Sequence, residues 1–406
     1  MIDQKEDILI IGAGMVGLCL AYNIKKTNSK ISILILDKEK NVGLHTSGRN
    51  SGVLHAGIYY EPNSLKAKVC VKGSRRLKKW CKEENIKILN CGKVIAPQTT
   101  SEDDMLDLLF DRGKKNGANV EIISKTKFNE LIPGGKIFKD RALWTPDTCV
   151  VNPQEIMKKM HQKLLMLGVK FKFNQKVNKV LSANTIQTNQ NIVIRYKYMF
   201  NSAGLNAVEI ANKFDLARNK IVLPFKGLYW QLKNNLKYKI HRNLYPVPNL
   251  DLPFLGIHFT PTLDGNIILG PTAIPALGKE NYQGTEGIEL KESLRFSKIL
   301  ISQFLKNEGN FRKYSLEQAN LGFKYNFWQS AKKLLPNLKL CDLERSQKVG
   351  IRPQVFDTKE KILINDFILE KRENSTHIVN AISPAFTASF ELADLILKKS
   401  DLFESI

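Results

Sequence analysis

The sequence predicts an α/β fold that opens with a buried parallel sheet, and the first 37 residues carry this prediction. The run from Ile8 to Ile11 is aliphatic without alternation, as expected of a strand buried on both faces. It leads directly into the spaced glycines Gly12, Gly14 and Gly17, which are followed by apolar residues at helical spacing. A second aliphatic strand then ends on Asp37. Strand, glycine turn, helix, strand and terminal acid in this order are typical of a Rossmann-like dinucleotide-binding domain.

Each position of this motif has a physical role. Gly12 allows a sharp turn, Gly14 lets backbone N–H groups approach a pyrophosphate, and Gly17 lets the helix lie close to the strand. The carboxylate of Asp37 can accept hydrogen bonds from ribose hydroxyls. An ordinary βαβ turn without a ligand is the alternative interpretation. The cofactor contacts predicted here are Gly12, Gly14, Met15, Val16, Gly17, Asp37 and Lys38.

Length and composition limit the remaining possibilities. With 406 residues and 43% hydrophobic content, the chain exceeds what one βαβ domain needs, and two domains are expected. The polar start leaves no room for a signal peptide, and no apolar run approaches membrane-spanning length, so a cytoplasmic location is expected. The six cysteines form no Cys-x-x-Cys pair, and neither a metal site nor a disulfide is expected.

The net charge of +23 is the unusual feature of the composition, and it is compatible with nucleic acid, an anionic membrane surface or an acidic substrate. Lysine is spread through the whole chain, and its densest cluster, from Lys66 to Lys82, lies on a predicted amphipathic helix. We interpret this cluster as a solvated basic face. Nucleic acid is not expected as a partner, whereas peripheral contact with the inner face of a membrane stays open.

The segment from Gly43 to Tyr60 is rich in glycine and small polar residues, which suits a backbone that passes close to a flat cofactor. Together with the run from Pro62 to Ala67, it resembles the L-2-hydroxyglutarate oxidase/dehydrogenase family, which lies within the group of D-amino-acid, glycine and sarcosine oxidases. The resemblance extends from about residue 8 to residue 397. It implies FAD as cofactor, with contacts from Ser47, Gly48, Arg49, Asn50, Ser51 and Gly52.

Two later segments resemble the family's returns to the cofactor. A predicted strand that ends at Phe200 delivers Ala203 and Gly204 as a second glycine turn, and Val177 corresponds to a contact on the adenine side. Near the C-terminus, a strand and loop precede the last helix, whose N-terminal dipole would stabilise negative charge on the flavin. The contacts implied in that loop are Ser383, Pro384, Ala385, Phe386 and Thr387.

The same resemblance divides the chain into two interleaved domains. A discontinuous FAD-binding domain is expected from residues 1–84, 145–215 and 347–406, with Ala142 to Asp147 as a connecting loop. A substrate domain built on an antiparallel sheet with helices is expected from residues 85–144 and 216–346. Blocks that match the family in order and spacing are Pro224 to Trp230, Leu244 to Pro248, Pro253 to Thr260 and Asn266 to Pro271.

The implied chemistry is oxidation of a 2-hydroxy acid to a 2-oxo acid, with L-2-hydroxyglutarate as the best candidate and quinone or O2 as electron acceptor. Arg352 lies in a Gly-x-Arg-Pro strand whose arginine pairs with the substrate α-carboxylate in relatives and also touches the cofactor region. His258 or His55 would remove the hydroxyl proton. The second carboxylate needs further partners, for which the candidates are Lys226, Arg49, Tyr59, Tyr60 and Tyr245.

Several alternatives stay open. His258 could be a buried histidine satisfied by a carbonyl group, and Arg352 could form a structural ion pair at a strand end. The chain departs from the family pattern at Leu228, Thr272 and Phe386, which leaves room for another hydroxy acid, a polyol or a sugar acid. An amine or amino-acid oxidase is a further alternative, and the third is a basic flavoprotein that binds nucleic acid or a membrane.

Overall fold

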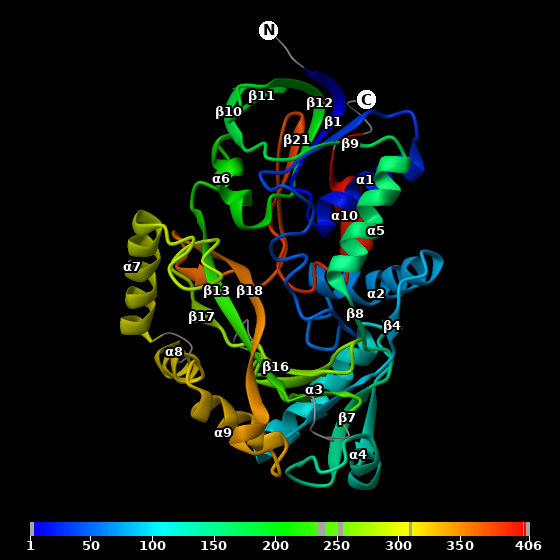
Figure 1. The fold of residues 1–406 in the computed structure, drawn as a ribbon, viewed down its shortest axis with the longest axis vertical. Helices are drawn as coiled ribbons and strands as arrows, with labels where there is room; N and C mark the ends of the chain where they lie inside the picture. Colours follow the sequence, from blue (N-terminus) through cyan, green and yellow to red (C-terminus); the bar gives the residue numbers. More distant parts are fainter. Residues whose placement is uncertain (1–3, 234–239, 251–254, 308–310, 401, 403–406) are drawn as a thin grey trace.

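The computed structural model describes residues 4–233, 240–250, 255–307, 311–400 and 402, and Figure 1 shows two parts stacked along the long axis. Pro253 and Phe254, which belong to one of the blocks matched above, lie outside the described residues. The upper part in Figure 1 holds both ends of the described chain.

The upper part is built on a sheet with a parallel centre. The strand β1 (Gln4–Ile11) pairs in parallel with β2 (Ile33–Leu36) and β12 (Val193–Asn201), and β12 pairs in parallel with β21 (Ser375–Asn380). All four residues of β2 and the last four of β1 are buried, as their unbroken aliphatic sequences predicted. The sheet is completed by β9 (Lys170–Lys172), β10 (Val177–Ser182), β11 (Thr185–Thr188) and β20 (Ile368–Arg372).

Helices from distant parts of the chain cover this sheet. A single apolar cluster joins the strands to α1 (Met15–Thr27), α2 (Leu65–Glu83), α5 (Pro153–Met166) and α10 (Ser389–Lys399). Helix α5 begins at a side-chain cap, because Asn152 Oδ1 accepts hydrogen bonds from the N–H groups of Gln154 and Glu155 while Pro153 occupies the first turn. The short helix α6 (Ala207–Asn212) follows the 3₁₀ turn η1 (Gly204–Asn206) after β12.

The lower part is built on a second, mostly antiparallel sheet. Its longest strands, β13 (Lys220–Leu232) and β18 (Leu343–Asp357), pair along almost their whole length. The remaining strands are β5 (Lys93–Ala96), β6 (Glu121–Ser124), β7 (Arg141–Thr145), β14 (Asn243–Pro246), β15 (His258–Pro261), β16 (Ile267–Gly270), β17 (Ile274–Pro275) and β19 (Ile362–Leu363). The helices of this part are α3 (Thr100–Lys115), α4 (Lys125–Leu131), α7 (Leu290–Lys306), α8 (Phe311–Asn320) and α9 (Lys324–Leu334), with the 3₁₀ turn η3 (Leu340–Asp342) before β18. A small sheet of β3 (Val53–Leu54), β8 (Cys149–Val151) and β4 (Ile88–Leu89) lies between the two parts.

The α/β fold with a Rossmann-like sheet and an antiparallel second sheet is therefore confirmed, but two local expectations differ. The segment Ala142 to Asp147 was expected as a loop, whereas Ala142 to Thr145 lie in β7, which pairs with β5 and β6. Residues 347–357, which we expected with the first domain, belong to β18 of the second sheet. Both strands pair with partners distant in sequence, which local patterning does not reveal. Within the described residues, no helix combines the length and apolar character needed to span a bilayer.

Candidate functional site

The glycine turn after β1 is packed too tightly for side chains. Gly12 has a φ of +104°, and a Cβ atom there would lie 2.6 Å from the carbonyl oxygen of Ser202 in the second glycine turn. A Cβ atom on Gly17 would lie 2.2 Å from the Gly12 oxygen. Helix α1 begins with no acidic residue in its first turn, and its Met15 N–H donates to Ser47 Oγ at 2.9 Å. The N-terminus of α1 therefore suits a phosphate group.

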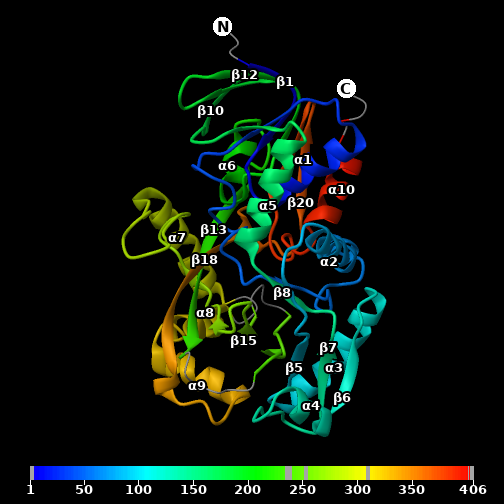
Figure 2. The same ribbon diagram turned by 45° about the vertical axis from the view of Figure 1, so that its right-hand side comes forward.

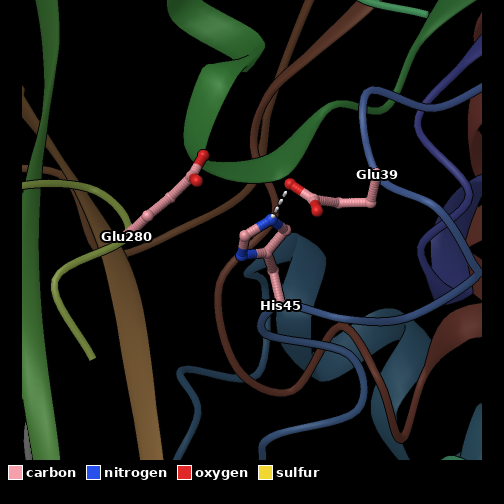
Figure 3. Close-up of side chains that lie close together, drawn as sticks. All are labelled: Glu39, His45 and Glu280. Carbon is pink, nitrogen blue, oxygen red and sulfur yellow. Dashed lines mark hydrogen bonds and ion pairs between the residues drawn. The ribbon is translucent and has the colours of Figure 1, made fainter. Parts of the chain in front are cut away.

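Asp37 and Lys38 directly follow β2. Asp37 binds neighbouring backbone N–H groups, and Lys38 binds Glu280 in a loop of the second part. The carboxylate of Asp37 accepts hydrogen bonds from the N–H groups of Ala13 at 2.7 Å and Glu39 at 2.9 Å. Figure 3 shows Glu39, His45 and Glu280 grouped beside this point, an arrangement of ligand types that a metal ion could use. The ammonium of Lys38, however, forms ion pairs with both glutamates and lies 3.1 Å from His45 Nε2. The cluster thus has its own cation and needs no metal for charge balance.

A cavity of about 860 Å³ extends from the glycine turn to the centre of the second sheet. It brings together most of the predicted site residues, from stretches that lie far apart along the chain. The predicted residues that line it are Gly14, Met15, Val16, Ser47, Arg49, Asn50, Ser51, His55, Tyr59, Tyr60, Gly204, Tyr245, His258, Arg352, Ser383, Pro384, Ala385, Phe386 and Thr387. Those outside its lining are Gly12, Gly17, Asp37, Lys38, Gly48, Gly52, Val177, Ala203 and Lys226.

His258 is held as a neutral imidazole with one nitrogen available. Its Nδ1 lies 2.8 Å from the Gly256 carbonyl oxygen, which fixes the hydrogen on Nδ1 and leaves the Nε2 lone pair free to accept a proton. The ring stacks on Tyr245 with centroids 3.8 Å apart. Burial, together with the charge of Lys93, lowers the pKa of His258 to about 4, although the bond to Gly256 opposes the shift.

His55 also lies in the cavity lining. Burial, together with the nearby charges of Lys93 and Arg352, lowers its pKa to about 3. Its buried Nδ1 has no hydrogen-bond partner among the described residues, which is costly unless a ligand or solvent supplies one. Both histidines can therefore accept a proton at neutral pH.

Two cations, Arg352 and Lys66, face the same cavity. Arg352 is carried by β18, in register with Phe225 of β13. Lys66 lies in the first turn of α2, is 8% exposed, and places its ammonium 5.6 Å from the centre of the Tyr60 ring. Burial and the charge of Arg352 lower the pKa of Lys66 to about 7. The carboxylate of Asp366 is near but accepts hydrogen bonds from the N–H groups of Leu65 and Lys66 at the helix start.

Lys66 was not among the predicted site residues, because we assigned it to a solvated basic face. The sequence held a signal, since Lys66 shares a helical face with Val69, Gly73 and Leu77, all of which are buried. Lys93 was also missed: it is fully buried, donates to Tyr59 Oη at 3.2 Å, and has its pKa lowered by burial to about 7.

Other candidates for the second cation are engaged elsewhere. Lys226 donates to Asn281 Oδ1 at 2.7 Å and lies outside the cavity lining. Arg49 lines the cavity, but its guanidinium stacks 4.1 Å from the Tyr282 ring centre and its Nε donates to the Leu44 carbonyl oxygen. Lys66 therefore has the most favourable position for a second anionic group.

The arrangement fits FAD at several independent points. Gly12 and Gly17 of the first glycine turn leave no space for Cβ atoms, the first turn of α1 carries no acid, and the cavity continues from Gly14 to the loop from Ala381 to Thr387. A dinucleotide with a flat ring system would place its pyrophosphate at α1 and its ring beside this loop. Arg352, His55 and His258 would then face the ring end of the cofactor.

Comparisons with known proteins agree with this geometry. A family model described as "DAO: FAD dependent oxidoreductase" matches residues 7–398. The L-2-hydroxyglutarate dehydrogenase of Indibacter alkaliphilus is 32% identical over 404 residues, covering 96% of this chain and 97% of that protein. The mitochondrial L-2-hydroxyglutarate dehydrogenase of Homo sapiens is 30% identical over 422 residues, covering 96% of this chain and 87% of that protein.

Solved structures share the fold at lower identity. The dithionite-reduced L-alpha-glycerophosphate oxidase from Mycoplasma pneumoniae, with FAD bound, superimposes with a TM-score of 0.74 at 21% identity, covering 99% of this chain and 95% of that one. Glycine oxidase from Geobacillus kaustophilus has a TM-score of 0.73 at 16% identity with the same coverage. Motif, cavity and family match lead to one conclusion: the chain belongs to the DAO family of FAD-dependent oxidoreductases.

Proposed function

We propose that this protein oxidises L-2-hydroxyglutarate to 2-oxoglutarate. The observation that carries the proposal is the presence of two cations, Arg352 and Lys66, on one cavity beside two neutral histidines. A 2-hydroxy dicarboxylate offers one anionic group for each cation and a hydroxyl proton for an imidazole. The identity of about 30% with dehydrogenases named for this substrate, over nearly the whole chain, supports the same choice.

Each side chain has a defined task in this proposal. The guanidinium of Arg352 binds the C1 carboxylate with its planar fork and keeps its charge at all relevant pH values. His258 accepts the hydroxyl proton at Nε2, with His55 as the alternative base. FAD, when bound, supplies the acceptor for the hydride that leaves C2. Tyr60 and Tyr245 form walls of the same cavity and exclude water from the reacting groups.

The distal carboxylate is assigned to Lys66. Its ammonium is buried, and no described carboxylate lies within ion-pair distance of it. An anion bound beside it would restore the charged state that burial disfavours. This pairing would also favour a dicarboxylate over a monocarboxylate of equal length, because a neutral chain end leaves the ammonium without a counter-charge.

The electron acceptor in this proposal is a quinone or O2, and the location is inside the cell beside an anionic membrane surface. The net charge of +23 supports the last point, because basic proteins gather at anionic bilayers at moderate salt.

The proposal is tested by adding substrates anaerobically to the purified yellow holoenzyme. L-2-hydroxyglutarate should bleach the flavin band and yield one 2-oxoglutarate per flavin, whereas D-2-hydroxyglutarate should not. Glycine, sarcosine, D-alanine and glycerol 3-phosphate serve as the competing substrates. If one of them bleaches the flavin and L-2-hydroxyglutarate does not, the assigned substrate is wrong.

A further inference from the structure

Helix α7 (Leu290–Lys306) lies at the outer edge of the second part in both views (Figures 1 and 2). Its inner face is anchored by Phe296, which is 3% exposed, with Ile299 and Leu300 packed beside it. These side chains contact an apolar cluster that includes Phe225 of β13 and Phe356 of β18. The helix is therefore fixed on the sheet by one face only.

The opposite face of α7 is apolar and open to solvent. The exposed fractions are 76% for Leu290, 65% for Leu294, 58% for Ile301 and 68% for Leu305. Offsets of four, eleven and fifteen residues from Leu290 place all four side chains on one stripe of a helix with 3.6 residues per turn. Large apolar side chains grouped in this way on a solvent-exposed surface mark an interaction site. We call these four residues the α7 stripe.

Cations flank the α7 stripe. The exposed charged residues of α7 are Lys291, Arg295, Lys298 and Lys306, and its acidic residue, Glu292, is partly buried. An amphipathic helix with leucine and isoleucine on one face and lysine and arginine beside them is typical of helices that lie in the plane of a bilayer surface. The stripe would enter the boundary between headgroups and acyl chains while the cations meet anionic headgroups.

We propose that α7 is the docking surface of this protein for an anionic lipid bilayer. Charge complementarity selects this occupant over a second copy of the chain, because two α7 faces would bring eight like charges together on a protein that already carries +23. The inference goes beyond the substrate assignment and holds for any substrate of the cavity.

The other basic helix, α2, is a weaker membrane surface. Its Lys66 faces the cavity, and Arg76 forms ion pairs with Glu391 and Asp394 of α10. The exposed lysines Lys68, Lys72 and Lys82 are not accompanied by a stripe of exposed large apolar side chains. These three lysines can be replaced as a control that removes the same amount of positive charge as the α7 variant.

The test measures binding of the flavin-loaded enzyme to vesicles by flotation, with pure phosphatidylcholine compared against phosphatidylcholine mixed with phosphatidylglycerol. Wild type should bind the anionic vesicles and not the neutral ones. The double variant Leu294→Gln/Ile301→Gln, which changes no charge, should lower the partition coefficient at least about tenfold. The triple variant Lys291→Gln/Arg295→Gln/Lys298→Gln should lower it to a similar degree.

The control is Lys68→Gln/Lys72→Gln/Lys82→Gln, which removes the same number of charges from α2 and should lower binding less than about threefold. All variants should keep wild-type flavin content and wild-type turnover with a soluble dye acceptor, since none of these residues lines the cavity. The proposal is overturned if the wild-type protein does not bind anionic vesicles, or if the α2 and α7 triple variants show the same decrease in partition coefficient. It is also overturned if light scattering shows an oligomer that the double variant dissociates, because a copy of the chain would then cover the stripe.

Discussion

Replacing Lys66 by methionine should change which substrates the enzyme prefers. The side chain is 8% exposed and lies close enough to Arg352 for that charge to lower its pKa. An ammonium and a carboxylate about 4 Å apart attract by about 4 kcal/mol at an effective dielectric constant of about 20, before the cost of desolvation. Truncating one partner of a buried charge pair costs about 2–5 kcal/mol. A loss of about 3 kcal/mol corresponds to a decrease of about 100-fold in kcat/KM for L-2-hydroxyglutarate.

The assay compares this dicarboxylate with L-2-hydroxypentanoate, which has the same carbon chain and no distal carboxylate. The Lys66→Met variant should lose activity on the dicarboxylate and keep its kcat/KM on the monocarboxylate within about threefold. Lys68→Met removes an exposed charge two residues further along the same helix and serves as the control, with both substrates unchanged. If Lys66→Met lowers kcat/KM equally for both substrates, Lys66 does not read the distal carboxylate.

Three further results are expected. Because Lys66 must be charged to bind a carboxylate and its pKa is about 7, kcat/KM for the dicarboxylate should fall relative to the monocarboxylate as pH rises above about 7, and Lys66→Met should abolish this difference. His258→Asn should slow anaerobic flavin reduction by about 10²- to 10⁴-fold with unchanged flavin content; if only His55→Asn does so, His55 is the base. Gly17→Ala should yield protein without the flavin absorbance, because its Cβ atom would overlap the Gly12 oxygen, and a yellow variant would contradict the tight turn.

The parts of the fold that follow from local patterning could be predicted from the sequence. Gly17 is needed because a Cβ atom there would overlap the Gly12 oxygen, and Gly12 because a Cβ atom there would overlap the Ser202 oxygen. The cap of α5 involves only Asn152 and the N–H groups two and three residues later. The second sheet was predicted only in outline. Its strand β7 pairs with β5, for example Thr145 with Lys93 at a separation of 52 positions, and such pairing leaves no periodic signal.

The site was predicted in part for a related reason. Arg352 and His258 stand in short motifs that resemble a known family, so their neighbourhood could be anticipated. Charged side chains are rarely fully buried, so Lys66 was interpreted as part of a solvated face and Lys93 was not considered as a site residue. Lys66 lines the cavity, and Lys93 lies behind it, where its ammonium donates to Tyr59 Oη, so both positions are properties of the assembled fold.

In the proposed function, Arg352 and Lys66 together bind the two ends of a dicarboxylate in front of FAD. A crystal structure of the holoenzyme with the product 2-oxoglutarate measures this directly. The C1 carboxylate should accept a pair of hydrogen bonds from the Arg352 guanidinium, and the C5 carboxylate should lie within about 3 Å of the Lys66 ammonium. A complex in which 2-oxoglutarate binds with its C5 carboxylate away from Lys66, or with Arg352 turned from the ligand, would contradict the account.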